Sequence, residues 1–112
     1  MKLPHAEHAV VEREKIVEYL LNPAHPDNGG KAAFFLGLGY NQDDWSSLAA
    51  ALCRLAVATE VGKSIETVHG TKYILDGHLE TVGGGTLVMR TIWIIDRGLD
   101  RPRLVTAYPH EE

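Results

Sequence analysis

The spacing of apolar residues predicts two short helices early in the chain. Residues 12–21, EREKIVEYLL, carry an apolar stripe at helical spacing with charged residues opposite it, and Asn22-Pro23 ends the segment. The stripe consists of Ile16, Tyr19 and Leu20. A second apolar run, residues 31–38, is closed by Gly39, because glycine readily takes the left-handed conformation at a helix end. Both segments are therefore expected to be helical, and the second to be buried.

A third helix is expected from about residue 41 to residue 59. Asn41 can cap its start, and Asp43 and Asp44 in the first turn suit the positive end of the helix dipole. Apolar residues then recur at helical spacing, namely Trp45, Leu48, Ala49, Leu52, Leu55 and Ala56. This amphipathic pattern indicates a helix that packs its apolar face, Trp45 included, on the core.

Beyond residue 61 the apolar period becomes two, which is typical of strands. β-branched and aromatic residues dominate four segments separated by glycine-containing turns, residues 62–68, 71–81, 86–96 and 102–108. The short connections, including the Gly83-Gly84-Gly85 turn, predict an antiparallel meander. The expected fold is therefore α+β, a single domain over residues 1–112 with a helical part at about 12–59 and a sheet part at about 62–108. The helices should cover one face of the sheet and leave the other face for a site.

Composition places the chain among ordinary small globular domains. Its 112 residues are 45% apolar and 23% charged, and no apolar run reaches the roughly 18 residues of a membrane span. We therefore expect a soluble, cytoplasmic protein. The start of the chain lacks the apolar segment of a general secretory signal, while export by a dedicated secretion machine stays open. The net charge of −4 argues mildly against broad, nonspecific nucleic-acid binding but allows a local basic site.

The loop between the first two helices is the most distinctive segment, NPAHPDNGGKAAFF. His25 stands between two prolines whose fixed backbone angles stiffen the loop, and Gly29-Gly30 permits conformations that other residues resist. Lys31 then opens the second helix, where exposed backbone N–H groups favour an anion. Histidine, lysine and amides together suit a phosphate. A purely structural explanation is also available, in which prolines and glycines only separate two helices around solvated side chains.

The last hairpin places three polar residues together. If residues 97–101 form its loop and the residues flanking them pair, Arg90 stands opposite Tyr108, and Thr106, opposite Ile92, shares their face. A permanent cation, a hydroxyl and a phenol on a sheet of apolar neighbours can grip a phosphate. Packing alone would also favour threonine and tyrosine in strands.

Two further residues are candidate substrate-binding residues. A register slip of one position would put Thr91 and Trp93 on the face assigned to Arg90. Lys72, at the start of the second strand, would add a positive charge if that strand neighbours the third. A lysine on a strand is otherwise an ordinary solvated or edge-protecting charge.

No metal or cofactor is expected. The histidines His5, His8, His69 and His78 match no ligand spacing and have no acidic cluster beside them. Because Cys53 is the single cysteine, an internal disulfide is excluded. We expect Cys53 to be a small buried residue. Nucleotide-binding and nucleophile-elbow fingerprints are missing from the sequence.

Several segments in combination resemble a known group of proteins. YLLNPAHPDNGGKAAFFLGLGY, GTKYILDG, MRTIWIID and the closing LVTAYP, together residues 19–109, resemble small bacterial toxin domains of the barnase-EndoU-colicin-RelE group of ribonuclease-like domains. The order NPxHPxGGxKAxxF, with GG one residue later here, followed by TAYP, carries the resemblance. It implies N-terminal helices leading into a four-stranded antiparallel sheet, and places His25, Lys31, Arg90, Thr106 and Tyr108 in the polar set.

The resemblance implies metal-independent cleavage of RNA by attack of a 2′-OH on its own phosphodiester. In that chemistry His25 could act as base or acid, Lys31 and Arg90 would stabilise charge on the phosphate, and Thr106 and Tyr108 would position it. The implied partners are RNA and a small inhibitor or antitoxin protein, and the implied place of action is the cytoplasm, including that of a target cell. The alternative function is a noncatalytic domain that binds a protein or small anion, which the acidic net charge favours.

Overall fold

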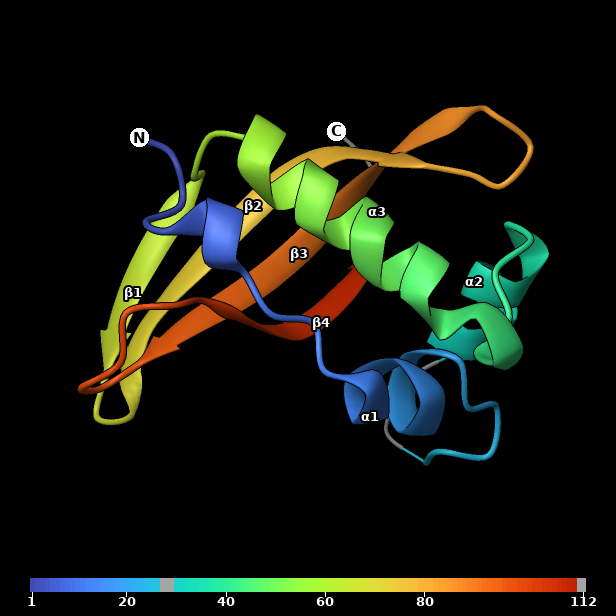
Figure 1. Ribbon diagram of the computed structural model, residues 1–112, viewed down its shortest axis with the longest axis horizontal. Coiled ribbons are helices and arrows are strands. Elements are labelled where there is room, and N and C mark those ends of the chain that lie inside the picture. The colour runs from blue at the N-terminus through green and yellow to red at the C-terminus, as the bar shows by residue number, and fades with distance from the viewer. Residues whose placement is uncertain (27–29, 111–112) are drawn as a thin grey trace.

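The computed structural model describes residues 1–26 and 30–110. Its helical elements precede its strands (Figure 1), and the first helix, α1 (Arg13–Lys15), continues directly into the π-helical turn η2 (Ile16–Leu20). The later helices are α2 (Lys31–Gly37) and α3 (Trp45–Ala58), and two 3₁₀ turns are η1 (Ala6–His8) and η3 (Gln42–Asp44). The three predicted helical segments are therefore confirmed, but the second, expected to be buried, buries only Ala32 and Phe35.

The sheet contains four antiparallel strands in the order in which they occur along the chain. They are β1 (Lys63–Thr67), β2 (Gly70–Glu80), β3 (Thr86–Asp96) and β4 (Arg103–Pro109). The observed bounds differ from the predicted ones by one residue at most, and those of β3 agree. The expected α+β fold, with helices leading into an antiparallel meander, is confirmed.

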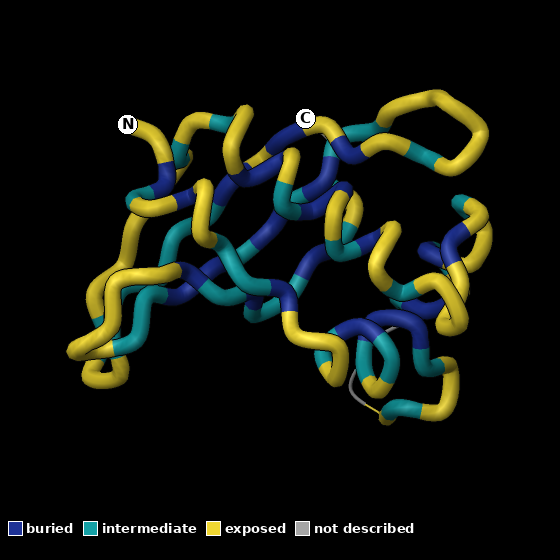
Figure 2. The backbone as a smooth tube through the Cα atoms, in the orientation of Figure 1, coloured by how far each residue is buried: buried dark blue, intermediate teal, exposed yellow. Residues whose placement is uncertain are grey.

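The core lies between α3 and one face of the sheet (Figures 1 and 2). Alternate strand residues are buried there, among them Leu75, Leu79, Met89, Trp93 and Ala107. Gly77 belongs to the same face, and a Cβ at this position would overlap the side chains of Thr59 and Leu55. Glycine therefore lets α3 lie close to β2. Most side chains on the opposite face of the sheet are partly buried or exposed, and Ile94 is a buried exception.

Local capping agrees with the sequence, but the first helix has an unexpected geometry. The side chain of Asn41 accepts a hydrogen bond from the backbone N–H of Asp44, as a cap should. In the first helix the N–H of Leu21 donates to the carbonyl of Ile16 at 2.7 Å, a five-residue step instead of four. The apolar stripe expected at α-helical spacing is therefore presented by a wider π turn, with Ile16 and Leu20 buried and Tyr19 partly exposed.

The register of the last hairpin is as predicted at its far end and shifted near its loop. Arg90 pairs with Tyr108, and Ile92 pairs with Thr106. A bulge then intervenes, so that Ile94 pairs with Arg103, one residue earlier than a regular ladder from the 97–101 loop requires. A regular ladder would set Leu104 opposite Ile94, on the face of the polar trio; instead it lies opposite Trp93 on the core face and is buried.

Candidate functional site

A cluster of polar side chains joins the helical part to the edge strand β4. We call Tyr19, Lys31, Arg90, Thr106 and Tyr108 the β4 cluster; every member is partly exposed. Its centre is the phenol of Tyr19, which accepts a hydrogen bond from Lys31 Nζ at 2.8 Å and lies 3.4 Å from the Thr106 hydroxyl. The cluster can form because Tyr19 of η2 lies against Thr106 of β4.

Lys31 links the two tyrosines of the cluster. Gly30, with a φ of 86°, precedes it, and Lys31 is the first residue of α2. Its ammonium nitrogen lies 5.2 Å from the ring centre of Tyr19 and 5.8 Å from that of Tyr108. Both distances suit cation–π attraction, so two aromatic faces and one hydroxyl hold the charge in place.

The charge beside Tyr19 alters its proton affinity. Burial opposes ionisation of the phenol, but the hydrogen bonds from Lys31 and Thr106, with the positive charges of Lys31 and Lys15, outweigh it and lower the pKa of Tyr19. The Lys15 ammonium lies 5.3 Å from the centre of the Tyr19 ring. The surroundings of Tyr19 thus favour its phenolate more than those of an ordinary tyrosine do.

Arg90 stands at the sheet side of the cluster and is tied to a carboxylate. Its Nε and Nη2 donate to the two oxygens of Asp76, at 2.8 and 2.9 Å, across β2 and β3. The bond from Arg90 is the main reason that the pKa of Asp76 is lowered, and Asp76, followed by Tyr108, raises the pKa of Arg90. His110 Nε2 lies 3.3 Å from Arg90 Nη2 and 3.8 Å from Asp76 Oδ2. Arg90 is therefore a permanently charged, oriented group whose charge is partly neutralised.

His25 lies on the other side of Tyr19. The two rings meet edge to face with their centres 5.0 Å apart. Both line a shallow hollow of about 320 Å³, whose other lining residues are Glu12, Glu14, Lys15, Glu18 and Arg103. The hollow thus mixes carboxylates with cations, so His25 has an acidic neighbourhood that the loop sequence alone did not predict.

A chain of contacts connects the five residues that the sequence singled out as catalytic. His25 meets Tyr19, which bonds to Lys31 and Thr106; Lys31 reaches Tyr108, and Tyr108 pairs with Arg90. Gly29, proposed to shape the same loop, lies outside the described residues.

The two residues expected to assist in substrate binding do not join this chain of contacts. Lys72 is on β2 four residues from Asp76, about 13 Å along the strand. Thr91 is a correction, because it is fully buried on the core face. Its hydroxyl donates to the carbonyl of Leu75 and accepts from Trp93 Nε1. A one-residue register slip would be needed to expose it, and the observed register leaves Arg90 on the open face.

Sequence reasoning missed Tyr19, Asp76 and His110. Tyr19 was assigned to the apolar stripe, although a phenol on a packed face needs a polar partner, and that need was the available signal. Asp76 pairs with Arg90 across the β2–β3 hairpin, whereas pairing of the predicted strand ends, residues 81 and 86, would have set it opposite Thr91. His110 lies just past the end of the predicted strand, and no pattern indicated it.

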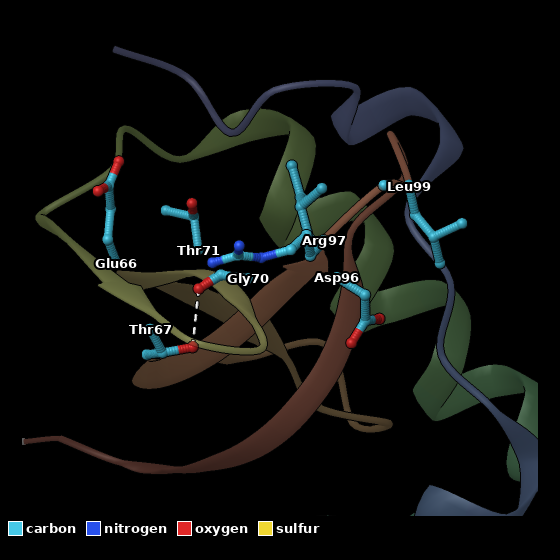
Figure 3. A pocket seen from close by; sticks show the side chains of 9 residues that line it. Glu66, Thr67, Gly70, Thr71, Asp96, Arg97 and Leu99 are labelled. Carbon is cyan, nitrogen blue, oxygen red and sulfur yellow. Dashed lines mark hydrogen bonds between the residues drawn. The ribbon is translucent and has the colours of Figure 1, made fainter.

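Another hollow, of about 310 Å³, lies at the opposite end of the sheet (Figure 3). It forms where the β1–β2 turn meets the β3–β4 turn, and Arg97 reaches across it toward Gly70 and Thr71 (Figure 3). Gly70 pairs with Asp96, six residue pairs from Asp76 and Arg90, or about 20 Å. The Asp96 carboxylate at this hollow is bound by Arg103 at 2.7 and 3.0 Å.

Within residues 1–26 and 30–110, no three histidine, cysteine or acidic residues are grouped so that they could hold a metal ion. In the same part of the chain, no helix is both long and apolar enough to cross a membrane.

Comparison with known proteins places the chain in a sequence family and identifies a structural relative. The family model described as "Domain of unknown function (DUF6883)" matches residues 2–111. No curated protein matches the chain by sequence. A chain of the solved structure titled "Contact-dependent growth inhibition toxin - immunity protein complex from Klebsiella pneumoniae 342" is similar in fold, with a TM-score of 0.73 at 16% identity. The similarity covers 96% of this chain and 98% of that one.

Proposed function

The chain belongs to the DUF6883 family, whose description names no activity, and we propose that it is a toxin-type domain that cleaves RNA without a metal ion. In this proposal it is a member of the barnase-EndoU-colicin-RelE group. The β4 cluster is its active site, with His25 at the edge of that site.

The observation that carries the proposal is the contact of Lys31, on α2, with residues of two other segments. Its ammonium group bonds to Tyr19, on η2, and lies over the ring of Tyr108, on β4, while the Tyr19 hydroxyl also lies 3.4 Å from Thr106. A lysine held by aromatic faces and a hydroxyl at a partly exposed edge can bind a phosphate and stabilise the charge that grows on it.

The remaining roles follow from position. Thr106 and Tyr108 would orient the phosphate through their hydroxyls, and Arg90, fixed by Asp76, would hold Tyr108 and add positive charge. His25 would supply one of the two proton transfers, since an imidazole exchanges protons near neutral pH. The nucleophile would be the 2′-OH of the substrate, which makes RNA the substrate and excludes DNA.

The structural relative supports the toxin assignment and the expectation of a protein partner. Its title names a growth-inhibition toxin with an immunity protein, and its fold matches over nearly the whole of this chain. A domain that cuts cellular RNA would harm its producer. We therefore propose that a small inhibitor protein covers the β4 cluster, and that the domain acts in the cytoplasm, including that of a target cell.

A noncatalytic domain that binds a protein or small anion is the second candidate. The carboxylates of Glu12, Glu14 and Glu18 around the hollow of His25, and the pairing of Arg90 with Asp76, favour it. The net charge of −4 points the same way.

Cleavage of matched oligonucleotides separates the two candidates. The purified domain is incubated with an RNA, with the same sequence as DNA, and with an RNA carrying one 2′-deoxy position. We expect cleavage of the RNA alone, blocked at the 2′-deoxy position and leaving a 2′,3′-cyclic phosphate. Lys31→Met should abolish cleavage, and Lys72→Met, a lysine outside the cluster, should not. A folded wild-type domain that binds but never cuts RNA would favour the noncatalytic candidate.

A further inference from the structure

Transesterification of RNA needs a group that removes the 2′-OH proton and a group that protonates the leaving 5′ oxygen. His25 can serve as one of them. We infer that Tyr19 is the other, a catalytic base that accepts the 2′-OH proton. This inference rests on the proposed function and names a residue that the sequence pattern assigned to the core.

Among the described residues, two side chains help to position the Tyr19 hydroxyl. Lys31 Nζ donates to it at 2.8 Å, and the Thr106 hydroxyl lies 3.4 Å away. These groups come from α2 and β4, so the oxygen is held between the helical part and the sheet. A phenolate there would accept hydrogen bonds from both groups, each strengthened by the negative charge. The arrangement therefore stabilises the deprotonated form, which is the form that a base requires.

The surroundings of the ring act in the same direction. Among the described residues, the charged or titratable groups facing Tyr19 are Lys15 from α1, Lys31 from α2, and His25 from the loop, with Glu12, Glu14, Glu18 and Arg103 around the shared hollow. The two ammonium groups stand 5.3 and 5.2 Å from the ring centre. Their joint effect with the hydrogen bonds exceeds that of burial, and the pKa of Tyr19 is lowered.

The local backbone is consistent with a functional position. Tyr19 lies in the π turn Ile16–Leu20, and such turns in α-helices occur often at functional sites. The turn leaves Ile16 and Leu20 buried while Tyr19 remains partly exposed at the edge of β4.

The reaction balances with groups of this chain alone. The Tyr19 phenolate takes the proton of the 2′-OH, and the 2′ oxygen forms a bond to phosphorus. The bond from phosphorus to the 5′ oxygen breaks, and that oxygen takes a proton from the His25 imidazolium. Lys31 remains charged and stabilises the phosphate. The products are a 2′,3′-cyclic phosphate and a 5′-hydroxyl.

His110 is the competing candidate. It is held by Arg90 at 3.3 Å and by Asp76 at 3.8 Å, on the far side of the cluster from His25. A histidine paired with a carboxylate can also exchange protons. The test must therefore separate Tyr19 from His110.

The first measurement needs no substrate. The phenolate ultraviolet absorbance of the wild-type domain, which has four tyrosines, is titrated against pH beside that of Tyr19→Phe. The difference in absorbance between the two proteins reports ionisation of Tyr19, and we expect it to titrate below the ordinary tyrosine value of about 10. In a Lys31→Met background the pKa of Tyr19 should move back up. A difference that titrates at or above the ordinary value in the wild type overturns the inference, whether or not RNA is cut.

The second measurement is cleavage. If Tyr19 is the base, the kcat of the wild type should rise with pH as the phenol loses its proton. Tyr19→Phe should lower kcat by about 100-fold or more, leave KM nearly unchanged, and abolish this rise. Tyr73→Phe, a partly buried tyrosine on β2, is the matched control and should keep the wild-type profile; His110→Gln should do the same. Full activity in Tyr19→Phe, or loss of the pH-dependent rise in His110→Gln instead, overturns the inference. A wild-type domain that cleaves no RNA at all refutes the proposed function and the reaction together, and the titration then still reports separately on the phenol.

Discussion

The guanidinium of Arg90 and the carboxylate of Asp76 face each other across β2 and β3 in a two-point ion pair of 2.8 and 2.9 Å. Such a fork fixes the plane of the guanidinium as well as its position. Arg90 is therefore better suited to orient Tyr108, opposite it on β4, than to move toward a substrate. The cation that meets two other members of the cluster is Lys31.

The ion pair predicts a dependence of stability on pH. Arg90 lowers the pKa of Asp76 in the folded state, so the folded protein binds fewer protons than the unfolded chain between the two pKa values. The stabilisation is complete above the unfolded pKa of about 4 and is lost as the pH falls through the folded value. Asp76→Asn should lower Tm at pH 7, and its difference from the wild type should shrink in acid.

Thermal melts from pH 7 to pH 3 check this prediction. Asp100→Asn, a substitution in the exposed β3–β4 loop, is the control and should follow the wild-type curve. A gap between Asp76→Asn and the wild type that stays constant across this range would contradict the assigned role of Asp76.

A second prediction concerns toxicity. Arg90→Ala should abolish growth inhibition in cells that express the domain alone, because Tyr108 loses its oriented neighbour and the phosphate loses a positive charge. It should also weaken binding of the proposed inhibitor, and that binding should be salt-sensitive, since opposed charges steer association. Growth curves, circular dichroism and calorimetry at low and high salt measure these effects.

Removal of Arg90 also leaves the Asp76 carboxylate without its cation. The double variant Asp76→Asn/Arg90→Ala removes both charges and serves as the control for stability. If that folded double variant inhibits growth as strongly as the wild type, Arg90 has no part in toxicity. Harmless, soluble wild-type protein in cells without an inhibitor would favour the noncatalytic candidate.

The contact between α3 and β2 predicts a large effect of one methyl group. Gly77→Ala should destabilise the protein, by about 1–3 kcal/mol if it behaves as ordinary overpacking, because the new Cβ would overlap Thr59 and Leu55. Gly83→Ala, where a Cβ would meet open space, should change Tm little. Urea unfolding measures both differences, and equal midpoints for the two variants would show that α3 does not pack closely on Gly77.

Chelation tests the absence of a metal from the proposed reaction. RNA cleavage should persist in excess EDTA, because the proposed charge stabilisation comes from Lys31 and Arg90. The rate of cleavage of a fluorogenic RNA, with and without the chelator, is the measurement. Complete loss of cleavage, restored by zinc or magnesium, would refute the roles given to these residues.

Much of the fold was predictable because it depends on local patterns. The change of apolar period near residue 61 separates helices from strands, and β3, Thr86–Asp96, has the bounds expected from its sequence. The facing of Arg90 and Tyr108 was also predictable, because a short loop sets the register of an antiparallel hairpin. The bulge between that pair and the loop was not, since several ladders satisfy the same alternation.

The site was only partly predictable. The proline-flanked loop indicated His25 and Lys31, and the last hairpin indicated Arg90, Thr106 and Tyr108. Nothing in the apolar stripe separated Tyr19 from its buried neighbours Ile16 and Leu20, because a periodic pattern records which face a residue lies on and not what its hydroxyl meets.

The sequence by itself determined the order and type of the elements, the pairing of neighbouring strands, and the presence of two cation-bearing segments far apart in the chain. Only the tertiary structure decided that these segments meet, because Tyr19 of η2 bonds to Lys31 of α2 and lies against Thr106 of β4. It also decided that Thr91 is buried and that Arg90 is bound to Asp76. Periodicity reflects interactions between near neighbours in sequence, whereas a site made from separate elements depends on how those elements pack.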